Sequence, residues 1–576
     1  MVKMNKEKKM KKNNENCEYY IYGINRVAKD FIYIFDSINI VGIFDDNSKE
    51  GFFSGLPIVG NAKKILKEKN KKIILCDFDK EQKLKMCNYY GLKYGQDFLF
   101  ERDFFALLNT KFDLPNDKDV VMWGIGREGE RIYEKCLKGK IKYCIDSYSD
   151  KKSFMGVSIK RPDDVRDWEN VFVIITPRQN IAIITFLKEK GLHEGQNYIF
   201  ADRLTYDCAM LLERTIFDKN SYDLNCETML NHLEILGGGG TRTCCTTFVD
   251  QSIGNISNQP ICSVWGNMIH RILALSVENH TYSFCKKDMC PYFIGRDSGY
   301  NMNLEKEYKK VEDFPSVVAI GYDASCNLKC ATCRNNVYVA KGDEKKELCS
   351  ISKRLNDEII SKSKFLIMAG NGELFVSEAY RSVFCSDAIS YPQCVRILSN
   401  GTLFNEKNWN DFKTKVRGKV LATFSIDAAS KETYEKIRIG GKFENIVNNM
   451  EFASKLRKKG ELSYLRLNFV VQNLNYTEME DFVRWGLKLG VDEVFFTKIL
   501  NWGTYTDEQF KEISMFEHDG ITPKPELQEV LNRPIMRNRI VDLGTIQYAH
   551  KKVEGEYFYN YYMWELERKV QGLFEK

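Results

Sequence analysis

The chain has 576 residues, of which 43% are hydrophobic, 28% charged and 13% aromatic, so it is too long for one core and too apolar for extensive disorder. Its formal net charge is only +6, and acidic and basic residues are interleaved, which excludes an obligatory nucleic-acid partner. No apolar stretch approaches the roughly 18 residues that cross a membrane. We therefore expect a cytoplasmic globular protein built from three or four units.

Residues 1–17 form a basic N-terminal segment that begins MVKMNKEKKMKK. This run has neither the apolar core of a signal peptide nor the amphipathic pattern of a transit peptide. We expect a solvated, poorly ordered tail.

Residues 18–112 and 119–205 are two copies of one unit. Gly23 in EYYIYGINRVAKDF answers Gly124 in DVVMWGIGREGERIY at an offset of 101 positions, and each glycine stands between a strand pattern and a helix pattern. IVGIFDD likewise answers IKYCID, and KKIILCDF answers NVFVIITP. Strands that alternate with helices predict doubly wound, parallel α/β sheets, so we expect two Rossmann-like domains.

The second copy carries a glycine pattern typical of dinucleotide binding. GIGREG places Gly124, Gly126 and Gly129 between a strand and a helix, and Asp146 follows about twenty residues later, as the fingerprint requires. Such a turn lets a pyrophosphate approach the helix N-terminus. The pattern is compatible with a nucleotide site and with a purely structural turn.

The stretch 206–312 is rich in Gly, Cys, Asn and Thr, and we expect it to build little apolar core of its own. Many of the 18 cysteines of the chain crowd between residues 226 and 333. A reducing cytosol disfavours disulfides, so we interpret these cysteines as ligands of a metal or cluster. A bound cluster would order the stretch.

Six apolar strand patterns alternate with helical stretches between residues 313 and 505: SVVAIGYD, KFLIMAG, VRILSNG, VLATFSID, YLRLNFVV and EVFFTKI. Six β/α units predict a partial (β/α)6 barrel of the TIM type, in which the loops after the strands build the active site. Residues 506–576 end in the aromatic pattern YFYNYYMWELERKV, and we expect a helical extension there.

Cys326, Cys330 and Cys333 follow the first of these strands in GYDASCNLKCATCR. Three thiolates with CxxxCxxC spacing can ligate three irons of a [4Fe-4S] cluster and leave the fourth iron open. Here the sequence resembles the radical S-adenosylmethionine (SAM) superfamily, in which the open iron binds the amino and carboxylate groups of SAM. The alternative is a structural zinc knuckle, which would need a fourth ligand.

The resemblance also implies SAM contacts at the ends of the later strands. AGNGELF after the second strand resembles the motif that receives the SAM amino group, with Gly370, Gly372 and Glu373 in the matching positions. Polar residues at strand ends are also ordinary caps. The other expected contacts are Ser399 and Asn400 after the third strand, Ser425 and Asp427 for the ribose, Arg438 for the carboxylate, and Asn468 and Gln472 on the fifth strand.

A second cysteine group precedes the barrel. Its spacing resembles the first half of a SPASM signature, as in half-SPASM (twitch) modules, which implies a second [4Fe-4S] cluster on Cys226, Cys245, Cys285 and Cys290. Cys244 is an alternative to Cys245. In most relatives such a module follows the barrel. A zinc site with the same thiolates is the alternative.

These features predict a radical SAM enzyme that cleaves SAM reductively to a 5'-deoxyadenosyl radical and abstracts hydrogen from a substrate. The resemblance implies a one-electron reductant such as flavodoxin or ferredoxin. It is compatible with a small molecule such as a sugar or nucleotide-sugar, a glycan or a peptide as substrate. The rival hypothesis is a non-catalytic nucleotide-binding protein with structural zinc sites.

Overall fold

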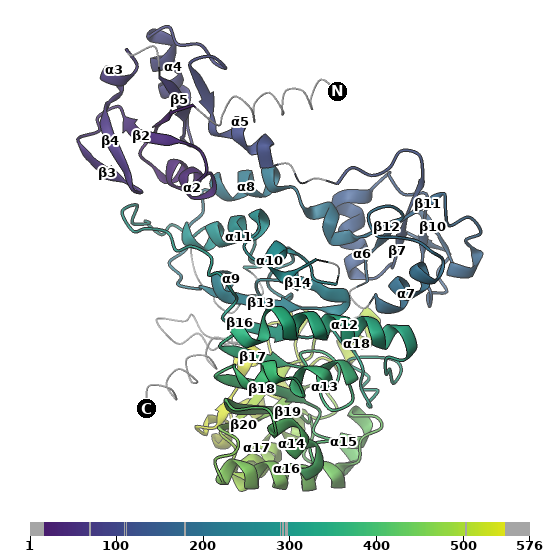
Figure 1. The fold of residues 1–576 in the computed structure, drawn as a ribbon. Coiled ribbons are helices and arrows are strands. Elements are labelled where there is room, and N and C mark those ends of the chain that lie inside the picture. The colour runs from purple at the N-terminus through teal and green to yellow at the C-terminus, as the bar shows by residue number, and fades with distance from the viewer. Residues whose placement is uncertain are drawn as a thin grey trace.

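The computed structural model describes residues 17–67, 71–108, 110, 112–177, 180–257, 259–287, 290, 293, 298–501 and 504–547. Over these residues the chain forms three sheets with helices packed on them, which confirms the predicted α/β class (Figure 1). Most of the predicted basic tail and the aromatic pattern beyond residue 547 lie outside the described residues. Within them, no helix combines the length and the apolar character needed to cross a membrane.

The two N-terminal sheets have the same strand order, β3-β4-β2-β1-β5-β6 in the first and β9-β10-β8-β7-β11-β12 in the second. Their pairs are parallel except for the antiparallel hairpins β3–β4 and β9–β10. The shared order agrees with the two copies in the sequence. The strands are β1 (Tyr19–Tyr22), β2 (Ile40–Asp45), β3 (Gly51–Phe53), β4 (Leu56–Asn61), β5 (Lys72–Leu75), β6 (Phe98–Phe100), β7 (Asp119–Trp123), β8 (Tyr143–Ile145), β9 (Ser153–Phe154), β10 (Val157–Lys160), β11 (Val171–Ile175) and β12 (Tyr198–Phe200).

Helices pack on these two sheets and dock them onto the rest of the chain. In the first unit, Asp30 on α2 accepts hydrogen bonds from Asn279 at 2.9 Å and from the Tyr308 hydroxyl at 2.7 Å. In the second unit, Lys188 on α7 pairs with Glu347 at 2.5 Å. The helices are α2 (Arg26–Ile34), α3 (Ala62–Ile65), α4 (Glu81–Tyr89), α5 (Glu101–Phe105), α6 (Arg127–Ile132) and α7 (Ile181–Glu189).

A ten-stranded sheet forms the body of the C-terminal half, with the order β15-β14-β13-β16-β17-β18-β19-β20-β21-β22. Strands β16 to β21 are the six strands predicted from the apolar runs, and neighbouring members are parallel. The strands are β13 (His232–Ile235), β14 (Gly240–Arg242), β15 (Gly254–Asn255), β16 (Val317–Ile320), β17 (Phe365–Met368), β18 (Cys394–Ser399), β19 (Lys419–Ser425), β20 (Tyr464–Val471), β21 (Glu493–Lys498) and β22 (Val541–Asp542).

The Cys-rich stretch belongs to the same sheet. Strand β13 pairs in parallel with β16, with His232 opposite Val317, and β14 and β15 continue the sheet antiparallel. The predicted boundary between residues 312 and 313 therefore falls inside one continuous sheet. The expectation of little apolar core is wrong for this stretch, because α11 buries side chains such as Ile272 and Leu273 completely.

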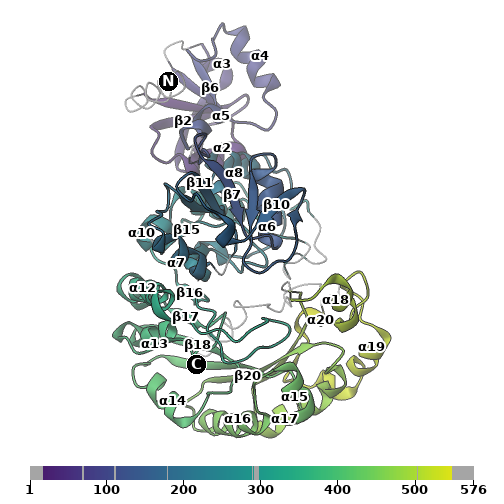
Figure 2. The ribbon, with the colours of Figure 1, turned by 90° about the vertical axis from the view of Figure 1, so that its right-hand side faces the viewer.

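The sheet is curved, with helices along its outer side (Figure 2). Several of these helices begin at a side chain that accepts a backbone hydrogen bond, as Ser377 does for α13 and Ser430 for α15. Helix α17 ends at Gly490 with a φ of 71°, which glycine adopts without strain. The helices are α8 (Cys208–Ile216), α9 (Thr228–Asn231), α10 (Ile261–Val264), α11 (Met268–Glu278), α12 (Gly342–Glu358), α13 (Glu378–Phe384), α14 (Glu406–Lys413), α15 (Lys431–Ile437), α16 (Phe443–Lys458), α17 (Met479–Leu489), α18 (Asp507–Ile513), α19 (Pro525–Leu531) and α20 (Gly544–Gln547).

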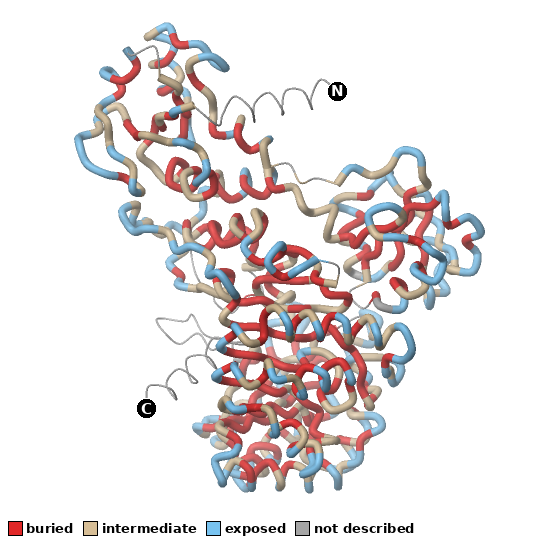
Figure 3. The backbone as a smooth tube through the Cα atoms, viewed as in Figure 1, coloured by how far each residue is buried: buried red, intermediate tan, exposed pale blue. Residues whose placement is uncertain are grey.

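Alternate residues of the central strands serve two different cores. Val318 and Leu366 belong to the main core with the helices, whereas Val317, Phe365 and Leu421 belong to a separate cluster. Successive side chains of a strand point to opposite faces, so the separate cluster lies on the inner, concave face. Figure 3 shows how densely the strands are buried. The inner face of the sheet therefore carries a layer of apolar side chains.

Asp542 on β22 makes the stability of this sheet depend on pH. Burial, and next the hydrogen-bonded Glu493, raise the pKa of Asp542 to about 7. In the unfolded chain, the Asp542 carboxyl has its ordinary pKa of 3.8. As the pH rises between these values, the unfolded state loses its proton first, so folding becomes less favourable.

Asp542→Asn is therefore expected to unfold at a less pH-dependent temperature than the wild type. The amide keeps an acceptor for Gly544 N–H, which lies 2.8 Å from the Asp542 carboxylate, and a donor for Glu493. Thermal unfolding at about pH 5 and about pH 8 measures the effect. Equal slopes for the two proteins would show that Asp542 does not titrate in this range.

Candidate active site

The loop between β16 and α12 carries the predicted cysteine triad. Cys326 and Cys330 are each 7% exposed, whereas Cys333 is exposed. Cys326 N–H donates to the Tyr338 carbonyl at 2.7 Å, and Cys333 N–H donates to the Cys330 carbonyl at 2.9 Å. The loop held in this way places all three thiols on the wall of one cavity.

Each thiol of the triad accepts a hydrogen bond from an N–H donor. Donors of this kind stabilise thiolates and tune the reduction potential of an iron–sulfur cluster. The donors are Asn400 Nδ2, 3.7 Å from Cys326 Sγ, Arg438 Nη1, 3.7 Å from Cys330 Sγ, and Arg334 Nη2, 3.5 Å from Cys333 Sγ. The donor set therefore fits a thiolate-held cluster.

Three thiols on one loop are the donor set of an iron–sulfur cluster, whereas a single zinc ion would need a fourth ligand. In the part of the chain that the structure describes, no three His, Cys, Asp or Glu side chains gather so as to hold one metal ion. Zinc needs four convergent ligands at about 2.3 Å, whereas a cubane takes each thiolate on a different iron. Burial raises the pKa of the Cys330 thiol and Arg438 opposes this rise, which helps the thiolate to form when iron binds.

Gly370 and Gly372 lie in the turn after β17 and line the same cavity. Gly372 has a φ of +73°, and a Cβ there would lie 2.4 Å from the Asp323 carbonyl oxygen, so only glycine fits. Gly370 N–H donates to the Ile320 carbonyl at 3.0 Å. The turn is thus held against the cysteine loop.

Glu373 lies behind this turn, outside the cavity wall. Its fully buried carboxylate accepts a hydrogen bond from the Ser399 hydroxyl at 2.7 Å and one from Asn400 N–H at 2.6 Å. Burial raises the pKa of Glu373, and these two donors oppose the rise. The carboxylate thus anchors the end of β18, whereas the sequence predicted that it receives the SAM amino group.

Glu373→Gln is expected to lower the free energy of unfolding by about 1–3 kcal/mol. The glutamine NH2 group would face either the Ser399 hydroxyl or Asn400 N–H, so one of these two buried donors would lose its acceptor. Glu378→Gln is the matched control, since Glu378 is exposed and pairs with Lys345 at 3.0 Å on the surface. The control should change by less than about 0.5 kcal/mol. Thermal unfolding compares the two, and equal losses would rule out the anchoring role.

Ser425 and Arg438 line the cavity, whereas Asp427 lies outside its wall and holds Arg438. One oxygen of Asp427 pairs with Arg438 Nη2 at 2.6 Å, and the other accepts from Val470 N–H at 2.8 Å. Burial raises the pKa of Asp427, and Arg438 opposes the rise. Asp427 has a φ of 66°, a region that Asp tolerates better than most residues. Its carboxylate is therefore committed to positioning Arg438 beside Cys330.

Asn468, Ser399 and Asn400 line the cavity from β20 and the end of β18. Among the described residues, the buried Asn468 Oδ1 has no hydrogen-bond partner. Gln472 is 1% exposed and lies outside the cavity wall, and its Nε2 likewise has no partner there. Asn468 thus lines the same cavity as the triad, whereas Gln472 lies outside the wall of this cavity.

The cavity has a volume of about 240 Å³. The lining residues that were not identified from the sequence include Arg334, Arg396, Arg466 and Phe495. Arg396 and Arg466 are 3% and 6% exposed. A charged residue inside an apolar strand pattern, as in VRILSNG and YLRLNFVV, is the signal that could have identified them, because burial of a charge needs a compensating partner.

The thiols of the second cysteine group influence one another electrostatically. Burial raises the pKa of the Cys244 thiol, and four neighbouring thiols raise it further. Those neighbours are Cys226, Cys245, Cys290 and Cys285. The four predicted ligands thus lie near enough to Cys244 to influence its pKa, but among the described residues they do not form a group that could hold one metal ion.

The glycine turn of the second unit is tightly packed. A Cβ at Gly129 would lie 2.4 Å from the Gly124 carbonyl oxygen, whereas Gly126 has open space around it. The cavity at this turn measures about 40 Å³, and ligand sites usually measure roughly 300–1,000 Å³. Asp146 accepts a hydrogen bond from Tyr148 N–H at 2.9 Å and so shapes its own loop. Nucleotide binding at this turn stays a prediction.

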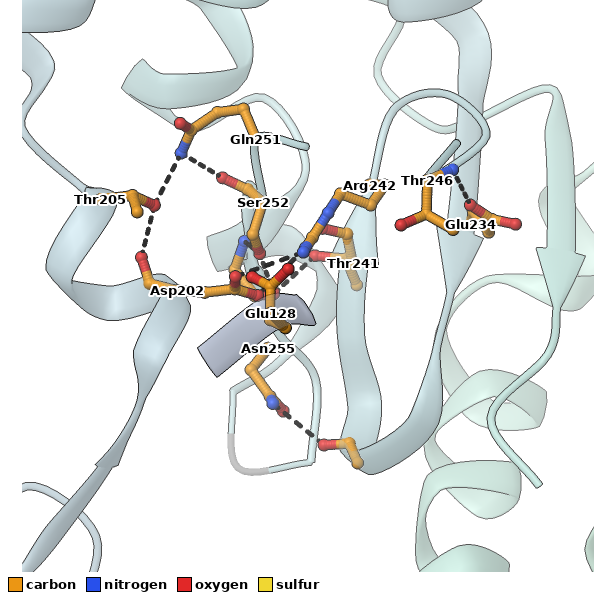
Figure 4. Close-up of polar contacts among 12 residues, drawn as sticks. Glu128, Asp202, Thr205, Glu234, Thr241, Arg242, Thr246, Gln251, Ser252 and Asn255 are labelled. Atoms are coloured by element: carbon orange, nitrogen blue, oxygen red, sulfur yellow. Dashed lines mark hydrogen bonds and ion pairs between the residues drawn. The ribbon is translucent and has the colours of Figure 1, made fainter. Parts of the chain in front are cut away.

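An ion pair between Asp202 and Arg242 joins the second unit to the Cys-rich stretch (Figure 4). Arg242 on β14 is 4% exposed and donates to both oxygens of Asp202, at 3.1 and 3.2 Å. Gln251 donates to the Thr205 hydroxyl at 3.3 Å, and Glu128 from α6 lies beside the pair. The second unit is thus joined to the large sheet by buried polar contacts.

Neither a family model nor a curated protein matches the chain. Among solved structures, it is similar to Streptococcus suis SuiB bound to precursor peptide SuiA, with 16% identity and a TM-score of 0.29 over 40% of this chain and 48% of that chain. The structure of Streptococcus suis SuiB bound to S-adenosylmethionine is 15% identical, with a TM-score of 0.30 over 42% of this chain and 54% of that chain. The structure of anSMEcpe with bound AdoMet is 20% identical, with a TM-score of 0.25 over 32% of this chain and 50% of that chain. The chain spans about half the length of these proteins, and likeness this low carries no argument about its activity.

Proposed function

We propose that the chain is a radical SAM enzyme whose Cys326, Cys330 and Cys333 hold a [4Fe-4S] cluster with one open iron. The observation that carries this proposal is that three cysteines of one loop, each with its own N–H donor, line a single cavity. We interpret β16 to β21 as a partial (β/α)6 barrel, because the loops after these parallel strands build the cavity.

When bound, the cluster supplies the electron that cleaves SAM to methionine and a 5'-deoxyadenosyl radical, which abstracts hydrogen from the substrate. Arg438 binds the SAM carboxylate, and Asp427 keeps its guanidinium in place. Gly370 and Gly372 allow a close approach of the SAM amino group to backbone carbonyls. Ser425 supplies a hydroxyl to the ribose.

Three residues that were predicted to contact SAM do not contact it in this proposal: Glu373, Asp427 and Gln472. Glu373 and Asp427 act as positioning residues, because their carboxylates already accept hydrogen bonds from the protein. Asn468 contacts SAM through its Oδ1, which has no partner among the described residues. Gln472 lies outside the cavity wall, so the proposal gives it no contact with SAM.

The second cysteine group is proposed to hold another [4Fe-4S] cluster, in a SPASM-like module placed before the barrel. Cys226, Cys285 and Cys290 would supply three thiolates, and Cys244 or Cys245 the fourth. The N-terminal sheets are proposed to be Rossmann-like domains. The reductant would be a flavodoxin or ferredoxin, and the substrate a small molecule, a glycan or a peptide.

Electron paramagnetic resonance of the reduced protein tests the open iron. The protein is reconstituted anaerobically with iron and sulfide, reduced with dithionite, and measured with and without SAM. We expect SAM to change the signal of the triad's cluster, since it becomes a ligand of one iron. A protein that binds SAM while its cluster signal stays unchanged would contradict the proposal.

A further inference from the structure

The floor of the cavity carries two buried guanidinium groups on the inner face of the barrel. Arg396 lies on β18 and Arg466 on β20, and both line the same cavity as the cysteine triad. Between them, on β19, the Thr423 hydroxyl accepts hydrogen bonds from Arg396 Nε at 3.3 Å and Nη2 at 3.2 Å. Thr423 is also the register partner of Arg466. Arg396 itself is the register partner of Leu421, two residues before Thr423, and its side chain reaches the Thr423 hydroxyl from there. The three residues thus lie on three adjacent strands, β18, β19 and β20.

Phe495 on β21 fixes the orientation of Arg466. The guanidinium carbon of Arg466 lies 3.6 Å from the centre of the Phe495 ring, so the planar group stacks on the aromatic face. Arg466 Nε is 3.8 Å from a Glu493 oxygen and, among the described residues, has no hydrogen-bond acceptor. The ring thus covers one face of the guanidinium, Glu493 lies on its Nε side, and Arg466 still lines the cavity.

Both guanidinium groups are buried and line the cavity, and a planar fork of N–H donors matches the oxygens of a carboxylate or phosphate. We propose that this floor binds an anionic group of the substrate and thereby holds the rest of the substrate toward the triad. The inference rests on the proposed function for the identity of the cavity as an active site. It narrows the substrate class to molecules with a carboxylate or a phosphate.

Direct binding of small anions tests the proposal. The protein, reconstituted and saturated with SAM so that Arg438 is occupied, is titrated by calorimetry with inorganic phosphate and separately with acetate, at constant ionic strength with chloride. We expect saturable binding of at least one of them. Phosphate binding alone assigns a phosphorylated substrate, and acetate binding alone a carboxylate.

Arg396→Met and Arg466→Met are each expected to weaken that binding by roughly tenfold or more, since a hydrogen bond to a charged group contributes about 1.5–3 kcal/mol. Arg466→Lys should retain part of the affinity and shows that a loss is not due to misfolding. Arg417→Met is the matched control, because Arg417 is exposed and lies outside the cavity wall. It should bind like the wild type.

Two results would overturn the proposal: wild-type protein that binds neither anion, or an equal loss in Arg417→Met and Arg466→Met. Formation of 5'-deoxyadenosine by the wild type is measured on the same samples. If cleavage fails while the anion binds through Arg396 and Arg466, the proposed function fails and the binding site stands. If cleavage succeeds without anion binding, only the floor assignment is wrong.

Discussion

Cys330→Ala is expected to abolish 5'-deoxyadenosine formation. Cys330 is buried between the other two cysteines of its loop and accepts a hydrogen bond from Arg438, so its loss removes a ligand from the inside of the site. The effect should exceed the roughly 10–100-fold loss that removal of an outer-shell partner causes. Iron content and chromatographic assay of 5'-deoxyadenosine measure it together.

Two other cysteines provide controls for this variant. Cys262→Ala should behave like the wild type, because Cys262 is exposed on α10 and outside both cysteine groups. Cys285→Ala should lose iron from the second group while SAM cleavage continues. Equal loss of cleavage in Cys330→Ala and Cys285→Ala would contradict separate roles for the two groups.

Arg438→Met is expected to lower both stability and affinity for SAM. Removal of one partner of a buried ion pair costs about 3–5 kcal/mol, because the remaining charge stays buried. Here that charge is Asp427, 4% exposed, whose carboxylate would keep only the hydrogen bond from Val470. The KM for SAM should rise, since the predicted partner of its carboxylate is gone. Chemical denaturation and initial rates of cleavage measure the two effects.

A double-mutant cycle separates these two effects. Asp427→Asn combined with Arg438→Met should recover much of the lost stability without recovery of the KM, because the buried charge is removed but the SAM partner is still missing. The deficit of Arg438→Met alone should shrink as the pH falls, since burial raises the pKa of Asp427 and protonation removes its charge. A deficit that is independent of pH would show that Asp427 is not the charge left behind.

The six parallel strands β16 to β21 and the cysteine triad could be predicted because each has a local signature. Runs such as KFLIMAG become strands buried on both faces, and a parallel sheet covered by helices produces such runs. Strand β13 was not predicted, since HLEI is short, carries His232 and Glu234, and stands next to a glycine run. Its place in the sheet depends on pairing with β16, which is remote in sequence.

The roles of the carboxylates could not be predicted from their positions. Glu373 and Asp427 stand at strand ends where the resemblance places SAM contacts, but each carboxylate is satisfied by groups far away in the sequence. Arg396 and Arg466 were missed for the same reason. Their strands are otherwise apolar, and only the folded, curved sheet shows that both side chains line the cavity of the triad.

Reductive cleavage of SAM by the wild-type protein tests the central claim most directly. The reconstituted protein is incubated anaerobically with SAM and dithionite, and 5'-deoxyadenosine is quantified against a sample without reductant. We predict that 5'-deoxyadenosine forms only in the reduced sample. A protein with a complete, reducible cluster and bound SAM that forms none would contradict the assignment of Cys326, Cys330 and Cys333 as the reactive site.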